Sequence, residues 1–81
     1  MTIAQQFVKD HSNNNNFLKA LFYASTNFWD SDLWDNICDV LKCHFPVLQD
    51  DCDYMATLIA EDIREGRIDL DCEQVVVSFP S

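Results

Sequence analysis

The hydrophobic residues of this chain recur at helical spacing up to Gly66 and alternate with charged residues after it. The clearest stripe follows Asp30 or Ser31, either of which can cap a helix, and Pro46 stops it. A repeat near 3.6 residues is typical of a helix that buries one face. This segment therefore predicts an amphipathic helix with the buried stripe Leu33, Trp34, Ile37, Val40, Leu41 and Phe45.

Two shorter stripes predict helices nearer the N-terminus. Thr2 can cap the first, which places Ile3 and nearby apolar residues on one face and ends at residues 10–12. Residues 13–16 are asparagines, which favour a turn and an N-cap. The second helix is expected to run from residue 17 to about residue 24 or 26.

A fourth helix and an extended segment are predicted toward the C-terminus. Asp50 or Asp51 can cap the helix, which ends at Gly66. Beyond Gly66 a hydrophobic period of two predicts a half-buried strand. Residues 75–79 alternate in the opposite phase, and no two-residue hairpin signal lies before them. A bulge or bend is therefore expected near Glu73.

Together these elements predict a mainly α fold: a compact four-helix domain with a short extended or β segment at the C-terminus, α+β if that segment pairs. The 81 residues are expected to form a single small acidic domain, residues 1–81. The first residues lack the basic region and apolar run of a signal peptide, and no apolar run is long enough for a membrane span. A cytoplasmic location is expected, in the host cytoplasm if a phage encodes the chain.

The cysteines are expected to be reduced thiols that behave as small core or near-surface hydrophobes. His11, beside Asp10, is interpreted as part of a solvated helix end. Neither His11 nor His44 belongs to a local arrangement of nucleophile, base and orienting group. We therefore expect no metal site, no cofactor and no enzymatic activity. No Cys-x-x-Cys pair, as in common zinc sites, occurs among Cys38, Cys43, Cys52 and Cys72.

Acidic residues dominate the charge: fourteen Asp and Glu against five Lys and Arg give a formal net charge of −9. This charge disfavours direct binding to nucleic acid or to an anionic membrane, and it exceeds what solubility alone needs. On the third helix, Asp32, Asp35 and Asp39 project within about 60° of one another, opposite the apolar stripe. On an extended chain, acids two residues apart share a face at intervals of about 6.8 Å. Asp69, Asp71 and Glu73, on the strand predicted after Gly66, have this spacing and form a second set of acids.

In length, acidity, asparagine and aromatic content and lack of a catalytic motif, the chain resembles the small acidic proteins by which phages and mobile elements block host defence systems, the anti-restriction and anti-CRISPR class. The resemblance covers no alignable stretch, so no residue role carries over. It implies a nucleic-acid mimic that inhibits a nucleic-acid-handling protein or defence complex. The two sets of acids are expected to bind a basic surface of that partner.

A generic protein–protein interaction module is the alternative interpretation: an antitoxin, a transcription modulator or an assembly adaptor. Such a module would bind through exposed aromatics, such as Trp29 in the connector before the third helix, or through residues 75–79. Residues 75–79 offer unpaired backbone and alternating apolar side chains, so they are also expected to pair in a homodimer or with a partner edge. Binding through acids is salt-sensitive, whereas binding through apolar groups is salt-tolerant.

Overall fold

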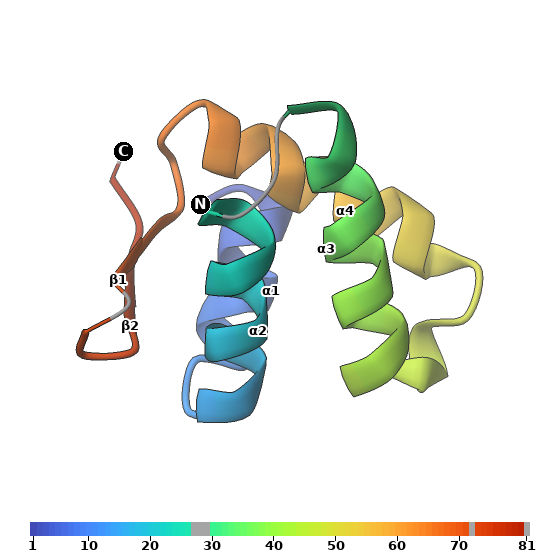
Figure 1. The fold of residues 1–81 in the computed structure, drawn as a ribbon, viewed down its shortest axis with the longest axis horizontal. Coiled ribbons are helices and arrows are strands. Elements are labelled where there is room, and N and C mark those ends of the chain that lie inside the picture. Colours follow the sequence, from blue (N-terminus) through green and yellow to red (C-terminus); the bar gives the residue numbers. More distant parts are fainter. Residues whose placement is uncertain (27–29, 72, 81) are drawn as a thin grey trace.

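Four helices and a C-terminal β-hairpin make up the described part of the chain, which is residues 1–26, 30–71 and 73–80 of a computed structural model (Figure 1). The predicted mainly α fold is confirmed, and pairing of the C-terminal segment makes it α+β. The helices are α1 (Ile3–Asp10), α2 (Asn15–Thr26), α3 (Asp30–His44) and α4 (Asp51–Arg64), with a short 3-10 helix, η1 (Pro46–Leu48), between the last two. The strands are β1 (Asp69–Asp71) and β2 (Val76–Ser78).

The two N-terminal helices begin at side-chain caps that the sequence predicts. The Oγ1 of Thr2 accepts the Gln5 N–H at 3.0 Å, and the Gln5 side chain accepts the Thr2 N–H at 2.9 Å, which forms a capping box. At the start of α2, Asn14 Oδ1 accepts the Phe17 N–H at 3.1 Å. The expectation that Ile3 is buried was wrong, because α1 turns a neighbouring face inward and leaves Ile3 59% exposed.

Helix α4 begins and ends at the predicted positions, but its N-terminus lacks a side-chain cap hydrogen bond. Gly66 follows it with a φ of 78°, and the N–H groups of Gly66 and Arg67 donate to the carbonyls of Ile63 at 3.2 Å and Asp62 at 2.7 Å. This is a Schellman motif, in which glycine avoids the cost of left-handed backbone. Asp50 takes the N-cap position, but its backbone is already helical and its side chain makes no cap hydrogen bond.

The core forms where α2, α3 and α4 pack together. Helix α3 turns Leu33, Ile37 and Leu41 inward, as predicted. Trp34 was expected in the same stripe but is 36% exposed, because its indole N–H donates to Thr57 Oγ1 at 2.8 Å on the surface of α4. The largest fully buried side chains are Phe17, Leu21, Ile37, Leu41, Ile59, Val8 and Cys52.

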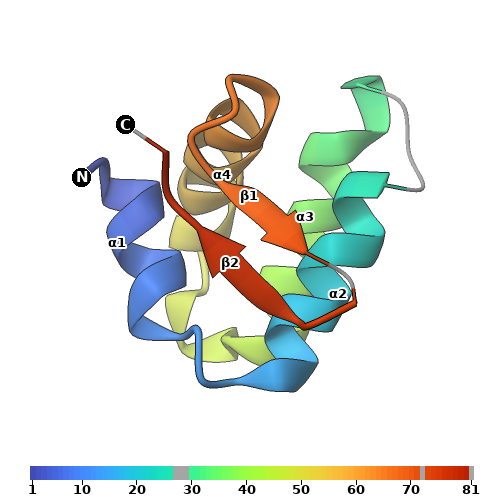
Figure 2. The same cartoon turned by 90° about the vertical axis from the view of Figure 1, so that its left-hand side faces the viewer.

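The C-terminal segment folds back on itself as an antiparallel hairpin that covers one side of the helices (Figure 2). Leu70 of β1 pairs with Val77 of β2, and both pack against the core. The bend expected near Glu73 is confirmed by a turn at residues 73–75, and this turn closes a hairpin although no two-residue hairpin signal is present. In the turn, Asp71 Oδ1 accepts the N–H groups of Glu73 at 2.9 Å and Gln74 at 3.3 Å, an aspartate-capped turn that needs no two-residue signal.

Pairing within the chain uses backbone that was expected to pair with another copy. In the described residues the sheet has two strands, so each strand keeps one unpaired edge. Pairing in a homodimer through such an edge stays a prediction.

A polar network joins both ends of the chain to the end of α4; Figure 2 shows the two termini on the same side of the molecule. Asp62 is buried, and its carboxylate accepts a hydrogen bond from Thr2 Oγ1 and another from Arg67 Nε at 2.7 Å. The bond to Asp62 raises the pKa of Arg67. Gln5 Nε2 donates to the backbone carbonyls of Arg67 at 2.7 Å and Pro80 at 3.3 Å. The network therefore fixes α1 and the last residues against α4.

Replacing Asp62 with alanine is expected to lower the free energy of unfolding by about 2 kcal/mol, because it removes charge-assisted hydrogen bonds from a buried group. Thermal unfolding followed by circular dichroism measures the change. Glu61→Ala is the matched control, since Glu61 is exposed on the same helix and should change stability by less than about 0.5 kcal/mol. Equal destabilisation by both substitutions would contradict the role of the network.

Candidate functional site

The acidic residues of α3 form an exposed row on the outer side of this helix. Asp32, Asp35 and Asp39 are all exposed, while Leu33 and Ile37 are buried on the opposite side. At a rise of about 1.5 Å per residue, the row extends over about 10 Å. The predicted geometry is confirmed, and we call these three aspartates the α3 row.

The second set of acids is less regular than predicted. Asp69 and Asp71 lie on the exposed face of β1. Glu73 is exposed but lies in the turn after the strand, so the three acids do not follow one extended segment. One oxygen of Asp71 also accepts the two N–H groups of the turn. We call Asp69, Asp71 and Glu73 the hairpin acids.

The two sets of acids lie on different sides of the molecule. Figure 1 shows the hairpin at the left and α3 at the right, with α1 and α2 between them. Because the buried side of α3 faces the core, the α3 row points away from the hairpin. One flat partner surface therefore cannot contact both sets, and each set must be considered as a separate site.

Side-chain hydrogen bonds that the sequence did not predict join α3 to α4. The indole N–H of Trp34 donates to Thr57, which leaves part of the ring exposed. Asp53 is exposed in the first turn of α4, and its carboxylate accepts a hydrogen bond from Cys38 Sγ at 3.0 Å. Sequence periodicity could not find these hydrogen bonds, because they depend on how two helices pack.

The thiol of Cys38 is poorly suited to nucleophilic chemistry. Burial, and then the hydrogen bond to Asp53, raise its pKa from the ordinary 9.0 to about 11. A thiol with a raised pKa stays protonated near neutral pH and reacts slowly. Cys52 is buried and Cys43 is exposed, and all three are free thiols in the structure. Cys72 lies outside the described residues.

The raised pKa of Cys38 predicts that stability falls as the pH rises from about 9 to about 11. In this range the unfolded thiol loses its proton while the folded thiol keeps it, so the unfolded chain gains stability relative to the folded one. Below this range the thiol is protonated in both the folded and the unfolded chain, so this loss of stability does not occur. Urea unfolding at about pH 9 and about pH 11 measures the change. Between these values the native chain should lose on the order of 1 kcal/mol more free energy of unfolding than Cys38→Ser, which has no titrating thiol at this position. An identical loss in the two proteins would contradict this assignment.

The two histidines lie in an aromatic cluster. The His11 ring centre is 4.7 Å from that of Phe7 and 4.5 Å from that of Phe45, and the His44 ring centre is 6.0 Å from that of Phe17. His11 lies at the end of α1, as expected, but its ring is half-buried against these side chains and not fully solvated as the expectation had it. In the part of the chain that the structure describes, no group of three or more His, Cys, Asp or Glu side chains is placed to hold a metal ion.

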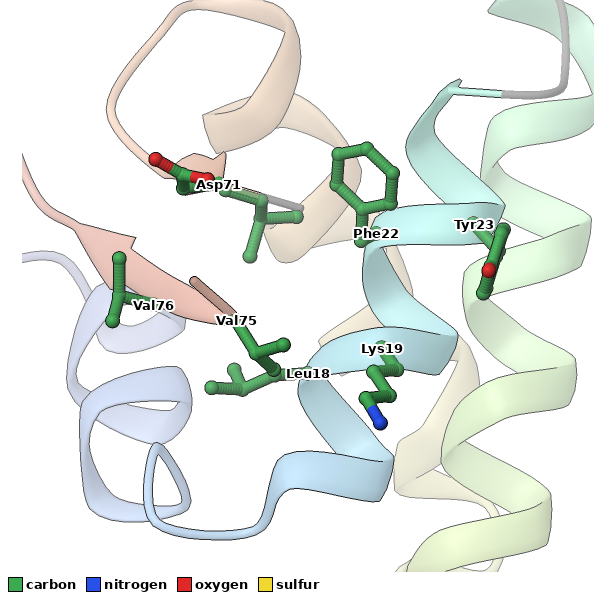
Figure 3. A pocket seen from close by; sticks show the side chains of 8 residues that line it. Leu18, Lys19, Phe22, Tyr23, Asp71, Val75 and Val76 are labelled. Atoms are coloured by element: carbon green, nitrogen blue, oxygen red, sulfur yellow. The ribbon is translucent and has the colours of Figure 1, made fainter. Parts of the chain in front are cut away.

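A pocket of about 160 Å³ lies between α2 and the hairpin (Figure 3). Lys19 lies on its α2 side, and Asp71 lies on its hairpin side. The sequence predicts the two elements but not their contact, so this pocket was missed. Its apolar lining includes Leu18, Phe22, Leu70 and Val75.

Val75 has an unusual backbone for its residue type. Its φ of 53° lies in the left-handed region, which costs a residue with a Cβ about 1–2 kcal/mol. The hairpin turn holds it there, and its side chain packs on the core and lines the pocket. The turn thus keeps an isopropyl group at a position that favours glycine.

Trp29, the aromatic expected to bind a partner in the alternative interpretation, lies outside the described residues. No helix within those residues combines the length and the apolar character that crossing a bilayer requires. Comparison with protein-family models, with curated proteins and with solved structures finds no match to this chain.

Proposed function

We propose that the protein is a non-enzymatic binding protein that docks its α3 row on a basic surface of a protein that handles nucleic acid. The observation that carries the proposal is the exposure of Asp32, Asp35 and Asp39 on one face of one helix, in a chain with a formal net charge of −9. Long-range attraction speeds the encounter with a basic partner, and complementary charges fix the orientation. Basic, rigid surfaces are typical of nucleases, polymerases and effector complexes.

Within this class we favour an inhibitor of a host defence or nucleic-acid-handling protein, of the kind that phages and mobile elements make, acting in the cytoplasm. A row of carboxylates can take the place of phosphates on a surface that binds a nucleic-acid strand. The burial pattern supports an external role for the charge. Asp62 is buried in the structural network, whereas the other acidic side chains that the structure describes are exposed.

Two observations support a role without catalysis. The buried Cys38 thiol is held protonated near neutral pH by its raised pKa. The His11 ring packs between aromatic side chains, where it supports the core. We therefore assign these groups structural roles.

The pocket and the partly exposed Trp34 favour a second candidate function, an interaction module that binds through apolar contacts. Such a module could be an antitoxin, a transcription modulator or an assembly adaptor, and it could pair with a second copy through a free edge of the hairpin. Its affinity for a partner would change little with salt, because apolar contacts are not screened.

Competition with nucleic acid tests the proposed function. A partner captured from a lysate of the natural host should be released by the nucleic acid that it normally binds, and its affinity for this protein should fall steeply as salt rises. A captured partner that binds this protein and its nucleic acid at the same time, and whose affinity for this protein does not depend on salt, would overturn the proposal in favour of the interaction module.

A further inference from the structure

We propose that the pocket between α2 and the hairpin is a second binding site, which receives one aromatic side chain of a partner segment whose neighbouring residue is Lys or Arg. The inference rests on the proposed function in one respect, the basic character of the partner. It concerns a different face of the molecule from the α3 row.

The size and lining of the pocket fit a single ring. Its volume is about 160 Å³, and an apolar cavity of about 150 Å³ is known to hold benzene. Leu18 and Phe22 of α2 face Leu70 and Val75 of the hairpin across it, as Figure 3 shows for the labelled side chains. The two walls come from separate elements that pack on one core, so the pocket exists before anything binds.

The backbone of the turn supports a preformed wall. Val75 has a left-handed φ of 53°, and hydrogen bonds from two turn N–H groups to Asp71 hold the turn in place. Strained backbone of this kind tends to occur at binding sites, where the surrounding structure fixes it. Here it keeps an apolar side chain against the pocket.

The charges around the pocket select the partner. Asp71 lies on the hairpin side, with Asp69 on the same face of β1 and Glu73 in the adjoining turn, and all three are exposed. Lys19 lies on the opposite side, on α2. A cation beside the bound ring is therefore attracted toward the hairpin and repelled from α2. This asymmetry fits a basic segment with one aromatic anchor.

Titration of the ¹⁵N-labelled chain with blocked dipeptides, followed by NMR, tests the proposal. The probes are N-acetyl-Phe-Arg-amide and its reverse, Arg-Phe, with Phe-Glu and Gly-Arg as controls. At least one of the first two should give saturable shifts confined to residues 18–23, 70–71 and 75–76. Both controls should bind at least about threefold more weakly. Shifts spread over the acidic surface, no saturable shifts, or equal affinity for Phe-Glu and for the tighter-binding of the two basic peptides would each overturn the proposal.

Two variants separate this site from the α3 row. Asp71→Asn keeps an oxygen that can accept the turn hydrogen bonds but removes the charge, so it should weaken the preferred peptide about threefold and leave Phe-Glu no weaker than before. Asp39→Asn, on the far face, should change neither affinity. If α3-row docking fails while the peptides bind, the pocket site stands alone; if docking holds and the peptides do not bind, this inference fails alone. If Asp71→Asn and Asp39→Asn weaken binding of the preferred peptide equally, this also contradicts the proposed pocket site.

Discussion

Removal of residues 74–81 is expected to unfold most of the chain. The deleted segment contains β2, and its side chains Val75, Val77 and Phe79 pack against the helical core. Full burial of such side chains stabilises a fold by about 1.5–3 kcal/mol each, so three half-buried ones contribute about 3–4 kcal/mol. That is most of the roughly 5 kcal/mol expected for a domain this small. The deletion also removes Pro80, whose carbonyl accepts a hydrogen bond from Gln5.

Circular dichroism and light scattering after gel filtration measure the outcome of this deletion. The double variants Val77→Thr with Phe79→Thr and Val76→Thr with Ser78→Thr form a matched pair, since the first changes inward side chains and the second changes outward ones. Only the double variant Val77→Thr with Phe79→Thr should lower the melting temperature markedly. A truncated chain that keeps both its melting temperature and its size would show that the segment is a passive tail. Light scattering of the full-length chain at twice the monomer mass would support the predicted homodimer.

Elements fixed by local interactions were predictable from the sequence. The α3 stripe, the Thr2 cap and the Gly66 end each depend on residues within one or two helical turns, and all three are confirmed except for Trp34 in the stripe. The bend near Glu73 was predicted, but the pairing of the C-terminal segment stayed open, because the hairpin turn depends on hydrogen bonds to Asp71 and on a left-handed Val75, which the residue types do not favour.

The candidate site was predictable only where one helix carries it. Helical periodicity alone places Asp32, Asp35 and Asp39 on one exposed face. The separation of this row from the hairpin acids, the exposure of Trp34 and the pocket all depend on how elements distant in sequence pack together. The periodicity of the sequence does not predict those contacts.

Replacement of Asp32, Asp35 and Asp39 by asparagine is expected to weaken binding to the partner roughly 30- to 150-fold. Three exposed charge contacts of up to about 1 kcal/mol each sum to about 2–3 kcal/mol, and each 1.4 kcal/mol changes Kd about tenfold. Single substitutions should have small effects. The fold should survive, because the side chains are exposed and asparagine keeps their volume nearly constant.

The matched control removes three acidic charges elsewhere: Asp10→Asn, Asp50→Asn and Glu65→Gln, all at exposed positions outside both sets of acids. It removes as much negative charge from the chain as the row variant does. A general effect of net charge would weaken both variants equally, whereas docking through the α3 row weakens the row variant far more. The circular dichroism spectra of the two variants should match that of the native chain.

The affinity of the captured partner for the native chain, the row variant and the control variant, measured at about 0.05 M and about 0.5 M salt, tests the central claim most directly. We predict that the native and control proteins bind tightly at low salt and weakly at high salt, and that the row variant binds weakly at both. An affinity that neither the row substitutions nor salt changes would contradict docking through the α3 row.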